Sequence, residues 1–274
     1  MVMKTKRNLI IFIAVALASG WLGVLLDMVL SEQPEGNSLG MLLWLVTPIL
    51  TAVVLRIIDR DGKGIGLKPN LKGNGKWYGV SLLIYPVVTI ITVCLAMVFG
   101  SVELSGFTAA LLPMMAAAFL IEAVKNIFEE FAWRGYLTPK LMEYTKNDWC
   151  INAVSGLVWA LWHVPYYLIF LPDRYFTSMS RGTMVLMGIL IMSCWNIMFV
   201  EIYRLTKSVW PVVLMHAVED AVPTLLVTEG YFIFTKSGDT FFSPTDGVIA
   251  TALFLCIGFF LRLIRIKKER AEAK

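Results

Sequence analysis

Long apolar stretches separated by short polar segments run through the whole sequence. A helix needs about 20 mainly apolar residues to cross a bilayer. Eight stretches meet this length, and we predict transmembrane helices at residues 8–30, 39–58, 77–99, 107–131, 151–171, 183–203, 209–228 and 245–266. The pattern therefore predicts an all-α fold, a polytopic membrane helix bundle that forms a single integral membrane domain over residues 1–274.

Composition agrees with a membrane protein. Of the 274 residues, 58% are hydrophobic and 16% are charged, whereas soluble domains carry about 25% charged residues. The net charge of +4 is small, and no basic run is interleaved with aromatic residues, so we expect no nucleic-acid partner. The first apolar stretch follows basic residues, as a signal peptide does. It continues to Leu30, about twice the usual length of a signal-peptide core, so we interpret it as a retained helix.

Basic residues gather on one side of the predicted bundle. They are concentrated before the first helix, in the segment from Asp59 to Lys76, and in the tail from Arg262 to Lys274. Because cytoplasmic segments are enriched in Lys and Arg, both termini are expected in the cytoplasm. The basic tail can contact anionic headgroups of the lipid bilayer. We expect a multi-pass protein of the cell membrane, with a bacterial plasma membrane favoured.

Ionisable residues inside the apolar stretches fall into three elements. In the first, Glu130 and Arg134 are four residues apart, so they share a helix face and can pair. Glu129 points about 100° away and can face another helix. A charged group inside a membrane helix is costly and usually faces a partner or a cavity. This element therefore predicts one carboxylate held by Arg134 beside a second one available for chemistry.

The other two elements contain the only two histidines of the chain. His163 lies one helical turn beyond Trp159, and His216 lies one turn before Asp220. With a rise of about 1.5 Å per residue, all three elements can reach similar depths in the inner half of the bilayer. We expect them to meet there. Two further ionisable residues are expected to partner none of these elements: Asp27, at the membrane interface, and Lys125, which snorkels or pairs locally. Glu201 is also expected at the membrane interface.

These elements resemble the signature of the CAAX-processing and bacteriocin-processing (Abi) family of intramembrane endopeptidases, which includes the Ras-converting enzymes. The signature order is Glu-Glu-x-x-x-Arg, aromatic-x-x-x-His and His-x-x-x-Asn/Asp. The matching residues are Glu129, Glu130 and Arg134, then Trp159 and His163, then His216 and Asp220. Trp159 stands where Phe is commoner, and Asp220 where Asn is frequent. The predicted peptidase core covers about 107–228.

The resemblance implies hydrolysis of a peptide bond in a membrane-associated or lipidated peptide or protein substrate. Hydrolysis needs a base that activates water, an acid for the leaving amine and donors for the oxyanion. No Ser or Cys of the three elements is placed as a nucleophile, so a water-based mechanism is preferred. By analogy with the family, the roles are Glu129 as base, His163 as holder of the water, His216 and Asp220 as oxyanion stabilisers or orienting groups, and Glu130 with Arg134 as a brace.

The three elements are also compatible with a metal cofactor and with other functions. Glu129, His163 and His216 could bind zinc, since carboxylates and imidazoles are suitable ligands. The chain lacks His-Glu-x-x-His, and we favour no bound metal. One alternative is a non-catalytic bacteriocin-immunity or peptide-binding membrane protein on the same scaffold. Another is a proton-coupled transporter, although no paired halves with matching broken helices are visible. The sequence assigns neither the oligomeric state nor the prenylation of the substrate.

Overall fold

The computed structural model describes residues 2–30, 32–34, 36–62, 65–176 and 179–272. Within these residues, eight helical segments are long and apolar enough to cross a membrane. The prediction of an all-α polytopic bundle is thus confirmed, while the orientation of the termini stays a prediction. The spans are Met3–Val29, Leu39–Asp59, Gly75–Val98, Leu111–Tyr144, Asp148–Phe170, Arg181–Thr206, Trp210–Thr228 and Val248–Glu272.

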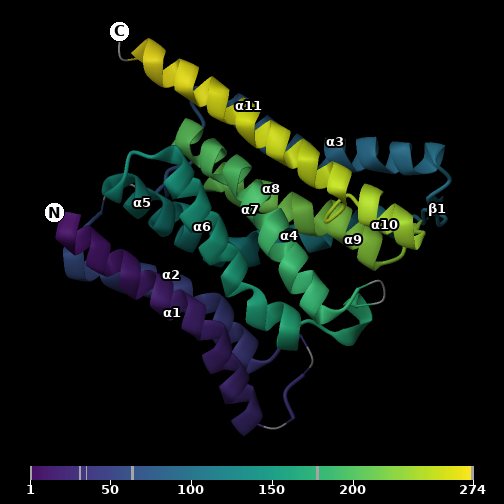
Figure 1. Cartoon of the computed structure of the whole chain (residues 1–274), viewed down its shortest axis with the longest axis horizontal. Helices are drawn as coiled ribbons and strands as arrows, with labels where there is room; N and C mark the ends of the chain where they lie inside the picture. The colour runs from purple at the N-terminus through teal and green to yellow at the C-terminus, as the bar shows by residue number, and fades with distance from the viewer. Residues whose placement is uncertain (1, 31, 35, 63–64, 177–178, 273–274) are drawn as a thin grey trace. The chain divides into compact units, whose positions relative to one another are not determined.

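Several of these spans contain more than one helical element (Figure 1). The α-helices are α1 Val2–Val29, α2 Leu39–Asp59, α3 Gly75–Val98, α4 Leu111–Ala132, α5 Thr138–Tyr144, α6 Asp148–Trp162, α7 Arg181–Thr206, α8 Trp210–Glu219, α9 Leu225–Thr228, α10 Lys236–Phe242 and α11 Val248–Glu272. The π-helical segments are η1 Trp133–Leu137, η2 Tyr166–Phe170 and η4 Asp220–Thr224, and η3 Asp173–Tyr175 is a 3₁₀ helix. The strands are β1 Val102–Leu104 and β2 Phe232–Phe234.

The chain divides into two compact units. Unit 1 comprises Met1–Gly66 and Phe128–Asn196, and unit 2 comprises Leu67–Ile127 and Ile197–Lys274. The chain passes between them three times, after Gly66, within α4 and within α7. The predicted peptidase core of 107–228 therefore contributes residues to both units. The prediction of one integral membrane domain stays a prediction.

In unit 1, α1 and α2 run side by side (Figure 1). The helices approach closely at Gly23 and Gly40, where a Cβ added to Gly40 would lie 2.1 Å from the Gly23 carbonyl oxygen. Small residues allow helix backbones to approach in this way. Asp27 then accepts a hydrogen bond of 2.8 Å from the Gly40 backbone N–H. Asp27 therefore links α1 to the first turn of α2.

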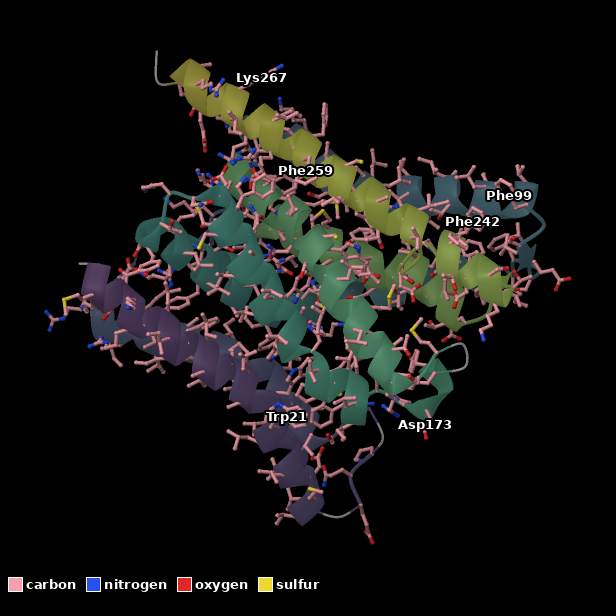
Figure 2. All side chains as sticks on the ribbon, viewed as in Figure 1. Trp21, Phe99, Asp173, Phe242, Phe259 and Lys267 are labelled. Atoms are coloured by element: carbon pink, nitrogen blue, oxygen red, sulfur yellow. The ribbon has the colours of Figure 1, made fainter. Side chains whose placement is uncertain are left out.

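In unit 2, α3 packs against α8 and α11, and a small apolar cluster lies at one end. The antiparallel pair β1–β2 closes this end, with Val102 opposite Phe234. Phe99 and Phe242 stack beside it with ring centroids 5.5 Å apart (Figure 2). Strands of three residues are too short to be recognised from the alternation of polar and apolar residues. The sequence did not predict them.

A buried ion pair joins α7 to α11 in unit 2. Arg265 donates from Nε to Glu201, and its Nη1 lies 2.7 Å from Glu269. The side chains of Glu201 and Arg265 are 0% and 2% exposed. From the sequence, Glu201 was predicted at the membrane interface, and neither its burial nor its pairing with Arg265 was predicted. The reason is that Arg265 lies 64 residues further along the chain, beyond the reach of a pattern in either helix alone.

Candidate active site

Each of the three sequence elements adjoins a π-helical segment. Arg134 lies within η1, η2 begins three residues after His163, and η4 begins at Asp220. A π turn changes the face to which the following side chains point, and such turns are frequent at functional sites. Proline explains two of them, because Pro165 immediately precedes η2 and Pro223 lies inside η4. Without an N–H, proline cannot continue the α-helical hydrogen-bond pattern.

Glu130 and Arg134 form the pair that the sequence predicts. Arg134 Nη1 lies 3.1 Å from each carboxylate oxygen of Glu130, and the side chains of Arg134 and Glu130 are 1% and 0% exposed. Arg134 Nη2 donates to Asn196 Oδ1 at 3.1 Å, and its Cζ lies 4.2 Å from the centre of the Trp159 ring. The guanidinium therefore pairs with Glu130 of α4 and connects η1 to α7 through a hydrogen bond and to α6 through a cation–π contact.

Asn196 is a member of this cluster that the sequence interpretation missed. Its Nδ2 donates to the carbonyl of Asn152 at 3.0 Å and to Ser155 Oγ at 2.9 Å. Gly156 permits this approach of α6 and α7, because a Cβ there would lie 3.2 Å from Ser193 Cα. The available signal was an amide side chain inside an apolar stretch.

Glu129 faces α6, as its angle from Glu130 predicts. Its Oε2 accepts a hydrogen bond from Trp159 Nε1 at 3.3 Å, and His163 Nε2 lies 3.9 Å from the same oxygen. His163 Nδ1 lies 2.9 Å from the Trp159 carbonyl. A carbonyl oxygen only accepts, so Nδ1 carries the proton of this bond. The imidazole therefore turns Nε2 toward the carboxylate, with both side chains buried.

Aromatic rings fix the position of His163. Trp44, from α2, stacks on Trp162 with ring centroids 4.0 Å apart and on Tyr166 at 5.1 Å. Trp44 Nε1 donates to the Trp162 carbonyl at 2.9 Å, and its ring meets His163 edge-on at 5.6 Å. The sequence assigned no role to the first three helices. A tryptophan in an apolar stretch gives no signal that separates this contact from ordinary packing.

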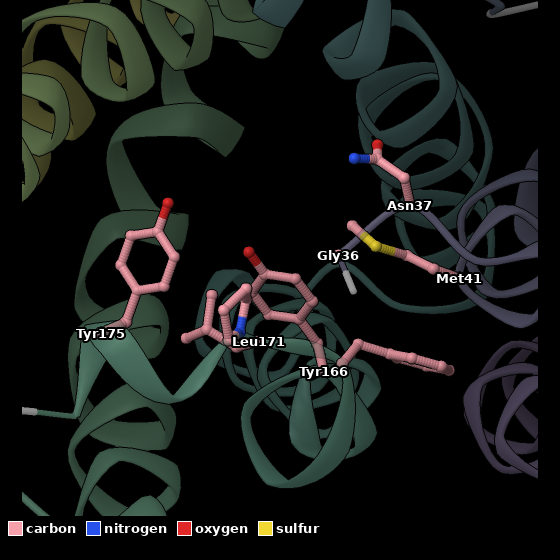
Figure 3. A pocket seen from close by; sticks show the side chains of 8 residues that line it. Gly36, Asn37, Met41, Tyr166, Leu171 and Tyr175 are labelled. Carbon is pink, nitrogen blue, oxygen red and sulfur yellow. The ribbon is translucent and has the colours of Figure 1, made fainter. Parts of the chain in front are cut away.

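A small cavity lies beside this aromatic group in unit 1. Its volume is about 130 Å³, and it is lined by Asn37, Tyr166 and Tyr175 among others (Figure 3). Ligand pockets commonly measure about 300–1,000 Å³. The cavity is therefore too small for a peptide segment, and we do not assign the substrate to it.

The third element forms a second cluster, in unit 2. His216, Glu219 and Asp220 each offer a nitrogen or oxygen atom, and these atoms lie within 4.8 Å of one another. The proximity of His216 and Asp220 agrees with their one-turn spacing. Phe199 meets the His216 ring edge-on at 5.5 Å. Glu219 had no role in the sequence interpretation, although it directly precedes Asp220.

Donors from α4 and η4 hold the carboxylates of this cluster. Asn126 Nδ2 donates to Asp220 Oδ2 at 2.8 Å, and Lys125 Nζ lies 3.4 Å from the same oxygen. Thr224 donates to Glu219 at 2.6 Å. Lys125 pairs locally with Glu122, as expected. The expectation that Lys125 partners none of the three elements was wrong, because α4 brings it next to the start of η4.

The donor types of the unit 2 cluster suit a metal ion such as zinc, which accepts imidazole nitrogen and carboxylate oxygen. Two features compete with a metal. Asp220 Oδ2 already contacts an ammonium and an amide N–H, and a metal on this oxygen would meet the positive charge of Lys125. The ligand set predicted from the sequence, Glu129, His163 and His216, draws on both units and stays a prediction.

A comparison with protein families matches part of the chain. Residues 107–222 match the family described as type II CAAX prenyl endopeptidase Rce1-like. This stretch includes all six predicted site residues, and it falls inside the core predicted from the sequence. No curated protein matches the chain.

Proposed function

Because residues 107–222 carry an Rce1-like domain of the CAAX protease family, we propose that this multi-pass membrane protein is an intramembrane endopeptidase. It hydrolyses a peptide bond in a membrane-associated or lipidated substrate. The observation that carries the proposal is the buried arrangement of Glu129 and His163, in which Nε2 faces the carboxylate at 3.9 Å. This arrangement supplies what a water-activating site requires.

The separation of the two side chains suits one bridging water. A distance of 3.9 Å is too long for a direct hydrogen bond and short enough for a single water to contact both groups. His163 Nε2 accepts a hydrogen bond from one O–H of the water, and the Glu129 carboxylate removes the other proton as the water oxygen attacks the scissile carbonyl. The new C–O bond forms at the carbonyl carbon. The proton taken by Glu129 then passes to the leaving nitrogen as the C–N bond breaks.

Charge that develops on the carbonyl oxygen needs a donor. We assign this role to His216, on the strength of its position in the third family element. Asp220 then orients His216. The Glu130–Arg134 pair acts as a brace, because Arg134 also contacts Asn196 and Trp159 and so fixes the helix that carries Glu129.

The family description suggests the class of substrate. Type II CAAX prenyl endopeptidases, as named, act on prenylated chains. We propose a peptide with a lipid-anchored residue, which the bilayer would concentrate beside the apolar helices of this protein. No bound metal is needed in this mechanism, since Glu129 provides the base.

The test uses purified full-length protein in phospholipid vesicles. The probe is a peptide ending in a farnesylated cysteine followed by three residues, and the matched peptide lacks the lipid. Cleavage products are identified by mass spectrometry. The variants are Glu129→Gln, which keeps size but removes the base, and Glu103→Gln, the same change at an exposed position on β1.

We expect cleavage by the native chain and by Glu103→Gln, and loss of cleavage in Glu129→Gln, with faster cleavage of the lipidated peptide. Binding of the peptide with no cleavage by any variant would overturn the proposal and favour the peptide-binding or immunity alternative. Cleavage that survives Glu129→Gln would refute the assigned base.

A further inference from the structure

Lys125 and Asn126 are adjacent residues of α4 that deliver two donors to one oxygen. Lys125 Nζ and Asn126 Nδ2 lie 3.4 Å and 2.8 Å from Asp220 Oδ2. Asn126 is fully buried, and the Asp220 side chain is 18% exposed. Two donors on one carboxylate oxygen define Asp220 as a hydrogen-bond acceptor.

The local balance of charge assigns Lys125 a specific task. Three carboxylates lie in this part of unit 2, those of Glu122, Glu219 and Asp220, and the Lys125 ammonium contacts the first and the last. A buried carboxylate is costly unless an opposite charge and hydrogen bonds compensate it. A neutral asparagine at position 220 would need no such partner.

We propose that Lys125 is a positioning residue that provides the counter-charge for Asp220 and, with Asn126, fixes it as an acceptor beside His216. This inference rests on the proposed peptidase function and extends it. It assigns separate roles to the two residues of the third element. Asp220 orients His216, and His216 donates a hydrogen bond to the oxyanion. Asp220 itself has no proton to offer a substrate carbonyl.

The inference predicts coupling between Lys125 and Asp220. In Lys125→Met, Asp220 loses its counter-charge and kcat falls at least about tenfold, with KM nearly unchanged, because the orientation of His216 acts on the transition state. In Lys125→Met/Asp220→Asn, the neutral amide needs no counter-charge. The double variant recovers to the kcat of Asp220→Asn alone. Lys125→Arg retains the charge and most of the activity.

The experiment measures kcat and KM in vesicles and the thermal unfolding midpoint of each variant. Lys236→Met serves as the matched control, because Lys236 is an exposed lysine of the same unit. The unfolding midpoint needs no catalysis. Lys125→Met should lower it, and the double variant should restore it toward the value of Asp220→Asn.

Three results would overturn the inference. The first is full activity in Lys125→Met, and the second is a double variant whose losses equal the sum of the single losses. The third is a loss in Lys125→Met that appears only as less folded protein, with kcat per folded molecule unchanged. If the native chain shows no cleavage, the proposed function fails. The unfolding midpoints of the native chain, the two single variants and the double variant still decide whether Lys125 and Asp220 are coupled.

Discussion

The clusters of the two units differ in how their carboxylates are engaged. In unit 1, Arg134 pairs with Glu130, and Glu129 contacts the Trp159 N–H and the His163 imidazole. In unit 2 the donors go to the carboxylates beside the histidine, with Lys125 and Asn126 on Asp220 and Thr224 on Glu219. The difference separates two tasks. A carboxylate that faces a histidine imidazole suits a base, whereas carboxylates held by several donors suit an orienting role.

The largest expected effect is the loss of kcat when the glutamate near each histidine is replaced. Glu129→Gln should lower kcat by about 10²–10⁴-fold, the usual contribution of a general base. Glu219→Gln should cost no more than about tenfold, because the amide oxygen can still accept from Thr224. The measurement is kcat in vesicles at equal amounts of folded protein. A larger loss in Glu219→Gln than in Glu129→Gln would move the base to unit 2 and break the comparison.

The next effect concerns the buried ion pair of each unit. Arg134→Met leaves Glu130 buried without its cation and should lower the free energy of unfolding by about 3–5 kcal/mol. Arg265→Met should cost less, although Glu201 is equally buried, because Arg204 Nη1 remains 4.0 Å from Glu201 Oε1. Chemical unfolding in detergent micelles followed by tryptophan fluorescence measures both. Adding Glu130→Gln to Arg134→Met should recover much of the loss, and no recovery would refute the brace.

A smaller effect tests the aromatic support of His163 in unit 1. Trp44→Phe keeps most of the ring stacking but removes the hydrogen bond from Nε1 to the Trp162 carbonyl. The expected loss is about 1 kcal/mol of unfolding free energy, with a modest fall in kcat. Thermal unfolding and the cleavage rate measure these changes. A rate unchanged by Trp44→Ala as well would show that the ring does not position His163.

The smallest effect is expected from metal removal. Incubation with a strong zinc chelator should leave kcat within about twofold, because Glu129 activates the water without an ion. Metal content of the purified protein is measured in parallel. Loss of activity that returns on adding zinc would contradict this expectation and direct attention to His216, Glu219 and Asp220.

The helices and the pairing within each element were predictable because they depend on short-range periodicity. Apolar length gives the eight spans, and a spacing of four gives the Glu130–Arg134 pair. The direction of Glu129 toward another helix followed from the same geometry. These features require knowledge of one helix at a time.

The missed residues are those whose roles depend on contacts between distant segments. Asn196, Trp44 and Lys125 each reach the clusters from another helix, and nothing in their own neighbourhood of sequence distinguishes them from packing or snorkelling residues. The π segments were also missed, since a π turn differs from an α turn by one residue and retains the same apolar pattern. Prolines at 165 and 223 were the available signals.

The most direct test of the central claim compares peptides released by cells that carry the native chain with those from cells that carry Glu129→Gln, at equal membrane amounts. Mass spectrometry of new peptide termini provides the readout, with Glu103→Gln as the control. We predict at least one terminus that is present with the native chain and with Glu103→Gln and absent with Glu129→Gln. Identical sets of termini from all three, together with a cellular effect of the chain that persists in Glu129→Gln, would contradict a peptidase function.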